Sequence, residues 1–140
     1  MQHVIVERDF AKPPERVFAY LAEHENLGAL FGAEIKRLRD GEDGQRNGVG
    51  SVRELKVGPL PPFEETIIEF VPDELIRYMI TKGSPLRHHA GEMRLSPTAN
   101  GTHLRYEIAF DGVLPGLAFL IARGLRKNIA AGLERVDPAA

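Results

Sequence analysis

The chain has 140 residues, of which 43% are hydrophobic and 27% charged, a composition that excludes a disordered protein and suits one domain, residues 1–140, with one core. Its 18 lysines and arginines and 20 aspartates and glutamates leave a net charge of -2, so nucleic-acid binding is not expected. The absence of cysteine excludes disulfides and cysteine-based metal sites.

The N-terminus is predicted to form a strand. Residues 3–8 contain the β-branched run Val4, Ile5 and Val6, and their alternation differs from the basic start and longer apolar run of a signal peptide. Nowhere does the chain approach the ~18 consecutive apolar residues that a membrane span needs. We therefore expect a cytoplasmic protein without stable membrane insertion.

Two short helices are predicted after this strand. Pro13 and Pro14 suit the start of a helix, and apolar residues recur at helical spacing as far as Ala22. A second apolar run over residues 27–31 ends at Gly32. His24 lies between the two helices and is expected to cap or border one of them.

Six further strands and a long helix complete the prediction. Turn-forming glycines, prolines and asparagines separate the segments 33–40, 49–57, 63–71, 74–82, 87–96 and 102–111. Residues 112–116 interrupt the strand pattern, and apolar residues at intervals of four predict a helix from Leu117 to about Val136, followed by a frayed end. A sheet with one buried face needs a cover, so we expect an α+β fold. In it, a curved seven-stranded antiparallel sheet packs its concave face against the long helix.

The order of these elements resembles the polyketide cyclase/dehydrase and lipid-transport superfamily, also called SRPBCC, with its START-like and birch-pollen-allergen-like members. The residues that carry the resemblance are Gly48-Val49-Gly50-Ser51-Val52-Arg53-Glu54, Glu65, Pro72, the segment 86–89, Gly101-Thr102 and Pro115-Gly116. The resemblance covers nearly the whole chain and implies a helix-grip fold around a pocket for lipids, polyketides, sterols or other apolar metabolites. Its motifs are turns and spacings, so it does not identify the ligand.

Strand alternation predicts which residues face the interior. The last strand has the apolar set 104, 106, 108 and 110 on one face, which must point inward. Pairing residue 95 with 104, 93 with 106 and 78 with 91 extends this inner face through the sheet. The predicted inner face then includes Arg53, Glu65, Ile67, Glu69, Tyr78, His89, Met93 and Tyr106.

The candidate ligand-binding residues are Arg53, Glu65, Tyr78, His89, Met93 and Tyr106. Arg53 and Glu65 are expected to pair diagonally, because a charge buried alone costs several kcal/mol. The pair either forms the polar end of the pocket or is a structural ion pair at the rim of the sheet. His89 is either a general acid or base, with Glu65 as the other catalytic candidate, or a hydrogen-bonded histidine without a chemical role.

No metal or cofactor is expected. Neighbouring histidines on a strand point to opposite faces, so His88 and His89 cannot hold one metal ion from one side, and His88 is expected to face solvent. Ser51 lies in no nucleophile motif, so it gives no support to a hydrolase.

Three glycines recur eight residues apart near the long helix, at positions 116, 124 and 132. A glycine inside a helix costs about 1 kcal/mol relative to alanine, so the space that it leaves should have a use. We favour cavity volume against the sheet over the approach of another helix or chain, and the second alternative leaves a homodimer open.

The leading hypothesis for function is the binding or transport of a small hydrophobic metabolite in a cavity between the sheet and the last helix. The first alternative is an enzyme like the polyketide aromatases, cyclases and dehydratases, in which His89 or Glu65 moves a proton. The second is an interaction protein like the quinone-handling or ribosome-associated relatives of the superfamily.

Overall fold

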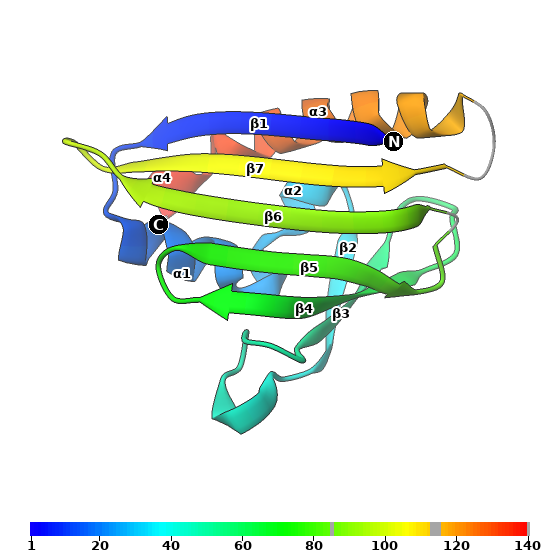
Figure 1. The fold of residues 1–140 in the computed structure, drawn as a ribbon, viewed down its shortest axis with the longest axis horizontal. Helices are drawn as coiled ribbons and strands as arrows, with labels where there is room; N and C mark the ends of the chain where they lie inside the picture. The colour runs from blue at the N-terminus through cyan, green and yellow to red at the C-terminus, as the bar shows by residue number, and fades with distance from the viewer. Residues whose placement is uncertain (85, 113–115, 140) are drawn as a thin grey trace.

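A computed structural model describes residues 1–84, 86–112 and 116–139 (Figure 1). The first part of the chain forms β1 (Gln2–Phe10), α1 (Pro14–Ala22), the 3-10 turn η1 (His24–Asn26), α2 (Gly28–Phe31), β2 (Glu34–Arg39) and the 3-10 turn η2 (Glu42–Gly44). The second part forms β3 (Val52–Lys56), β4 (Phe63–Val71), β5 (Leu75–Lys82), β6 (Arg87–Pro97), β7 (Thr102–Asp111), α3 (Leu117–Leu133) and α4 (Val136–Ala139). Residues 113–115, expected to end the strand pattern, and Pro85, in a predicted turn, lie outside the described residues.

The two short helices begin and end where local chemistry requires. Helix α1 begins at Pro14, because proline fixes the backbone angle of a first helical turn and leaves no amide hydrogen unpaired there. Helix α2 ends at Gly32, whose φ of 61° lies in the left-handed region that favours glycine. These two predicted helices are confirmed.

Within the described residues, seven strands form one antiparallel sheet in the order β1-β7-β6-β5-β4-β3-β2. The helices lie on one face of this sheet, and α3 runs along β1 and contacts α2 (Figure 1). The predicted helix-grip architecture is therefore confirmed, and its interior lies between the sheet and α3.

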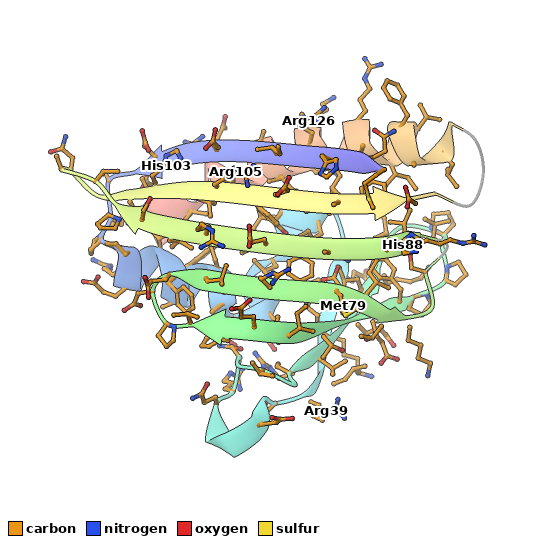
Figure 2. The ribbon with its side chains drawn as sticks, viewed as in Figure 1. Arg39, Met79, His88, His103, Arg105 and Arg126 are labelled. Atoms are coloured by element: carbon orange, nitrogen blue, oxygen red, sulfur yellow. The ribbon has the colours of Figure 1, made fainter. Side chains whose placement is uncertain are left out.

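The register of the central strands follows the predicted pairing. Met93 lies opposite Tyr106, and Gly91 lies opposite Tyr78. The side chains on this face are buried, whereas Arg105 on the alternate face is partly exposed. In Figure 2, Arg105 and His103 lie on the outer face of the sheet, on the side away from the helices.

A β-bulge in β4 changes the inner face near its end. The register shifts between Ile67 and Glu69, so one extra residue reverses the alternation beyond that point. The prediction that Glu69 points inward is wrong, because Glu69 forms an exposed ion pair with Arg77 at 3.1 Å. Phe70 takes the inner position and packs edge-on against Phe18 of α1, with ring centroids 5.1 Å apart.

Residues 136–139 form a helix, where a frayed end was predicted, and Val136 and Asp137 tie it to the rest of the fold. Helix α3 ends at Leu133, three residues before the predicted end, and the separate helix α4 begins at the fully buried Val136. The backbone amide of Ala11 donates a hydrogen bond to Asp137 Oδ1 at 3.0 Å, which ties α4 to the chain before α1. The apolar spacing alone did not indicate this anchor.

Candidate functional site

A cavity of about 630 Å³ lies between the sheet and the first half of α3. Its walls come from the ends of strands β3 to β7, from the loop that follows β3, from the turn between β5 and β6, and from α2 and α3. Most of the lining side chains are apolar. They are Phe31, Leu55, Val57, Leu60, Pro61, Phe63, Ile80, Leu86, Ile108, Phe110, Ile121 and Leu125, with Glu65, Tyr78, Gly83, Ser84, His89, Gly124 and Asn128 completing the lining.

The six predicted site residues are all buried, but they divide into two sets. Glu65, Tyr78 and His89 line the cavity. Arg53, Met93 and Tyr106 are buried but are not among its lining residues. The first set can therefore touch a molecule inside the cavity, whereas the second set can act on it through the first. We call Glu65, Tyr78 and His89 the polar corner.

Arg53 and Glu65 form an ion pair directly behind the cavity wall. The two residues lie directly opposite each other on β3 and β4, not diagonally as predicted, and only 2% and 4% of each is exposed. Arg53 Nε donates a hydrogen bond to Glu65 Oε1 at 2.9 Å, and Nη2 lies 2.9 Å from the same oxygen. Burial raises the pKa of Glu65 above its ordinary value, and the guanidinium opposes that rise.

Aromatic rings hold the guanidinium in place. The Arg53 guanidinium carbon lies 4.7 Å from the centroid of the Tyr78 ring and 5.4 Å from that of Phe31. A cation over an aromatic face is attracted by the ring quadrupole, and more strongly when both groups are desolvated. The ion pair is thus fixed on the side of Arg53 and reaches the cavity only through Glu65.

His89 presents a hydrogen-bond donor to the cavity. The backbone amide of Ile80 donates to His89 Nδ1 at 3.1 Å, so the proton of the neutral ring is assigned to Nε2. Burial, reinforced by the positive charge of Arg53, lowers the pKa of His89 to about 4, which keeps the ring neutral at pH 7. Nε2 lies 3.9 Å from Glu65 Oε2, too far for a direct hydrogen bond.

Gly91 makes room for Tyr78 on the neighbouring strand. A Cβ at Gly91 would lie 2.2 Å from Cζ of the Tyr78 ring, so no larger residue fits there without moving the ring. The Tyr78 hydroxyl is hydrogen-bonded to the Tyr106 hydroxyl, and burial raises the pKa of both phenols. Both tyrosines therefore stay protonated at neutral pH.

His24 was missed as a member of this network, because a residue between two helices was expected to cap or border one. It is fully buried, and its Nδ1 accepts a hydrogen bond from Arg53 Nη1 at 3.2 Å. Its Nε2 donates to Ser51 Oγ at 2.5 Å, and Ser51 Oγ donates to the carbonyl of Arg39 at 3.1 Å. Burial, then the charge of Arg53, lowers the pKa of His24 to about 3.

A signal for His24 was present in the sequence. The buried face of α1 contains Val17 and Leu21, and His24 continues their helical spacing of four and three residues. A polar residue in such a stripe must have a buried partner, and here that partner is Arg53.

No group of three or more metal-ligating side chains occurs in the part of the chain that the structure describes. His88, which is exposed, pairs with Asp111 on the outer face at 2.9 Å, whereas its neighbour His89 faces the cavity. His88 is thus exposed and His89 lines the cavity, as predicted, although the register of β6 shifts between Arg87 and Ala90.

A model of the family described as "polyketide cyclase / dehydrase and lipid transport" matches residues 1–140. The chain belongs to this family. The resemblance found in its turns and spacings is therefore confirmed.

Several solved structures have a fold similar to that of this chain. A START superfamily protein from Mycobacterium smegmatis is 18% identical, with a TM-score of 0.80 and 99% of each chain covered. The Aha1 dimer from Colwellia psychrerythraea is 13% identical, with a TM-score of 0.71 and coverage of 99% of this chain and 96% of that one. A norcoclaurine synthase point mutant from Thalictrum flavum, in complex with a transition-state analogue, is 12% identical, with a TM-score of 0.71 and coverage of 99% and 92%.

At these identities the likeness shows the fold alone. No curated protein sequence matches the chain. Among its described residues, this family member has no helix long and apolar enough to cross a membrane.

Proposed function

We propose that the chain acts as a single domain that binds or carries a small hydrophobic metabolite in the cavity between the sheet and α3. The observation that carries this proposal is the cavity of about 630 Å³, whose lining is mostly apolar and includes a few polar side chains. Pockets for drug-sized molecules span roughly 300–1,000 Å³ and combine apolar walls with a few placed polar groups. Both features are present here.

The hydrogen bonds of His89 and Ser51 support binding over base catalysis by His89 or nucleophilic catalysis by Ser51. The neutral His89 ring uses its Nδ1 lone pair for the amide of Ile80 and carries a proton on Nε2, so it has no lone pair directed at the cavity with which to act as a base. Ser51, which is hydrogen-bonded to His24 Nε2, donates its hydroxyl proton to the carbonyl of Arg39. A carrier needs no such reactive group.

The proposal is tested by placing a large side chain on α3 where it lines the cavity and measuring the loss of ligand binding. A Cβ at Gly124, which lines the cavity, would have no atom within 4 Å, so Gly124→Phe projects a ring into open space. Ala130→Phe is the matched control, because Ala130 is exposed on the same helix but is not among the residues that line the cavity. The probe is butylpyrene, whose fluorescence reports transfer from water to an apolar site.

We expect the wild-type protein and Ala130→Phe to bind one equivalent of butylpyrene and Gly124→Phe to bind it at least ten times more weakly. Equal binding by all three proteins would place the probe outside the cavity. No binding by the folded wild-type protein would contradict the proposal.

A second candidate is an enzyme of the cyclase or dehydratase type. The observation in its favour is that Glu65 Oε2 and His89 Nε2 face each other across 3.9 Å at the cavity wall, where both could contact one substrate oxygen. Such an enzyme would lose its rate in His89→Ala while keeping most of its substrate affinity. A carrier would show no turnover in either protein.

A homodimer, which the glycines of the last helix leave open, is a separate proposal. Sedimentation velocity measures it directly, since a dimer would have twice the 15.5 kDa of one chain. The proposed cavity lies within one chain, so a monomer would leave the binding function intact.

A further inference from the structure

The hydrogen-bonding capacity that the polar corner leaves unused defines what it can bind. At Glu65, Oε1 accepts a hydrogen bond from Arg53 Nε, whereas Oε2 has no hydrogen-bond partner among the described residues. Arg53 Nη2 lies 2.9 Å from Oε1 but makes no hydrogen bond, and Arg53 is not among the residues that line the cavity. At His89, Nδ1 is engaged by the amide of Ile80, and Nε2–H has no partner among those residues within hydrogen-bond distance. The corner therefore offers one strong acceptor and one donor, both on cavity-lining side chains.

The spacing of these two atoms suits a single oxygen. Oε2 and Nε2 are 3.9 Å apart. A ligand oxygen about 2.8 Å from each can form hydrogen bonds with both, and the angle between the two bonds at that oxygen is then close to a right angle. A hydroxyl group donates its proton to Oε2 and accepts from Nε2–H, so both cavity-facing groups are satisfied at once. An ether or ketone accepts only, and would leave the carboxylate oxygen of Glu65 desolvated without a donor.

The charge of the corner disfavours an ionised ligand. The charges of Arg53 and Glu65 cancel, and His89 is neutral. A ligand carboxylate would meet the free oxygen of Glu65 first, because Arg53 lies behind the wall with Nε on Glu65 and Nη1 on His24. A ligand ammonium would lose its water shell in an apolar cavity and would point its hydrogens at the donor Nε2–H.

We infer that the polar end of the ligand is an uncharged hydroxyl, so the ligand class is an apolar alcohol or phenol bound between Glu65 Oε2 and His89 Nε2. This inference rests on the proposed function, because it concerns the molecule that the cavity would hold. It excludes fatty acids and other ionised acids as preferred ligands, although they are equally apolar along their chains.

The experiment compares four probes that share one apolar body: pyrenebutanol, pyrenebutyl methyl ether, pyrenebutanoate and butylpyrene. Fluorescence titration of the wild-type protein gives their dissociation constants. The titration is done at about pH 7.5, which lies above the ordinary pKa values of carboxylates and of histidine. Two net hydrogen bonds predict that pyrenebutanol binds roughly tenfold more tightly than butylpyrene. It should also bind more tightly than the methyl ether, which can accept from His89 but cannot donate to Glu65, and more tightly still than pyrenebutanoate.

The variant His89→Leu removes the donor and leaves the Arg53–Glu65 pair untouched. We expect the preference for the alcohol over butylpyrene to fall about threefold or more in His89→Leu. His88→Leu, at the exposed neighbouring position, is the matched control and should keep the wild-type preference. Circular dichroism melting of both variants confirms that they are folded before the titration.

The outcomes separate the inference from the proposed function. Tightest binding of pyrenebutanoate would overturn the inference, because it would mean that the corner carries a net positive charge. Equal binding of the alcohol, the ether and butylpyrene would also overturn it, while leaving an apolar carrier intact. Failure of all four probes to bind would overturn the proposed function itself.

Discussion

The two halves of helix α3 contain the same small residue for opposite reasons. In the second half, a Cβ at Gly132 would lie 2.9 Å from Cα of Leu30, so this glycine lets α2 pack closely against α3. In the first half, Gly124 lines the cavity, and a Cβ there would meet no atom within 4 Å. One end of the interior is thus filled by packing, and the other is left open.

The apolar side chains of the helix divide in the same way. Ile129 and Leu133 are buried in the packed end, whereas Ile121 and Leu125 are only partly buried and line the cavity. Filled cores approach the density of organic crystals, so an unfilled volume of this size is not a packing accident in a well-folded domain.

The ion pair should give the largest effect on stability. Arg53→Met removes the guanidinium and leaves Glu65 buried without a partner, which we expect to lower the free energy of unfolding by about 3–5 kcal/mol. Urea unfolding followed by circular dichroism measures the loss. The double variant Arg53→Met with Glu65→Leu removes both charges and should recover much of it. An Arg53→Met protein as stable as the wild type would mean that the pair is hydrated in solution.

Because His24 and His89 are buried in their neutral form, we expect the free energy of unfolding to decrease as the pH falls. The folded pKa values of about 3 for His24 and about 4 for His89 lie below the ordinary value of about 6.5, so below that pH the unfolded chain binds protons that the folded chain does not. Each histidine therefore stabilises the fold fully above pH ~6.5, and this contribution is lost as the pH falls toward its folded pKa, by at most about 1.4 kcal/mol per pH unit.

Paired variants isolate this effect from the opposite contribution of Glu65, whose pKa is raised. Between about pH 5 and 7, a range that includes the ordinary pKa of histidine, the free energy of unfolding of His89→Gln should depend less steeply on pH than that of the wild-type protein. Urea unfolding at each pH measures this dependence. His88→Gln, at an exposed position, should follow the wild-type slope. Identical slopes in all three proteins would mean that His89 is solvated and not buried.

Alanine substitutions at Gly132 and Gly124 should affect stability in opposite directions, because one glycine lies in the packed end of the interior and the other in the open end. Gly132→Ala should destabilise the protein by about 1–3 kcal/mol, because the added methyl group meets the backbone of Leu30. Gly124→Ala should stabilise it by up to about 1 kcal/mol, because alanine is the better helix former and has space there. Thermal melting of the pair checks both signs. Loss of stability in Gly124→Ala would show that this end is closed in solution.

The outer face should give the smallest effect. Arg105→Ala removes an exposed side chain whose ion pair with Glu107 at 3.3 Å lies on the solvent side of β7, so the change in stability should stay within about 0.5 kcal/mol. Urea unfolding against the wild-type protein measures it. A loss of several kcal/mol would mean that the inner and outer faces of the sheet are exchanged.

Alternation predicted the inner face wherever the strands pair without interruption. Tyr78, Met93 and Tyr106 follow from the Gly91 and Leu104 pairings, which need only a period of two and a short turn. Glu69 was misplaced because a β-bulge adds one residue without any glycine or proline to mark it.

The parts of the site that come from different elements were harder to predict. His24 reaches Arg53 from the segment between α1 and α2. Its spacing from Val17 and Leu21 indicates that it is buried, but the identity of its partner depends on how the helices fold over the sheet. The anchoring of α4 by Asp137 likewise joins residues far apart in the chain. Strand periodicity predicts faces, whereas contacts between separate elements require the three-dimensional structure.

Native mass spectrometry of the protein, purified gently and followed by extraction of any bound molecule, tests the central claim most directly. A carrier with this cavity should retain a stoichiometric apolar molecule that carries a hydroxyl group, and Gly124→Phe should be empty under the same conditions. An empty wild-type protein that also fails to take up added butylpyrene would contradict the account.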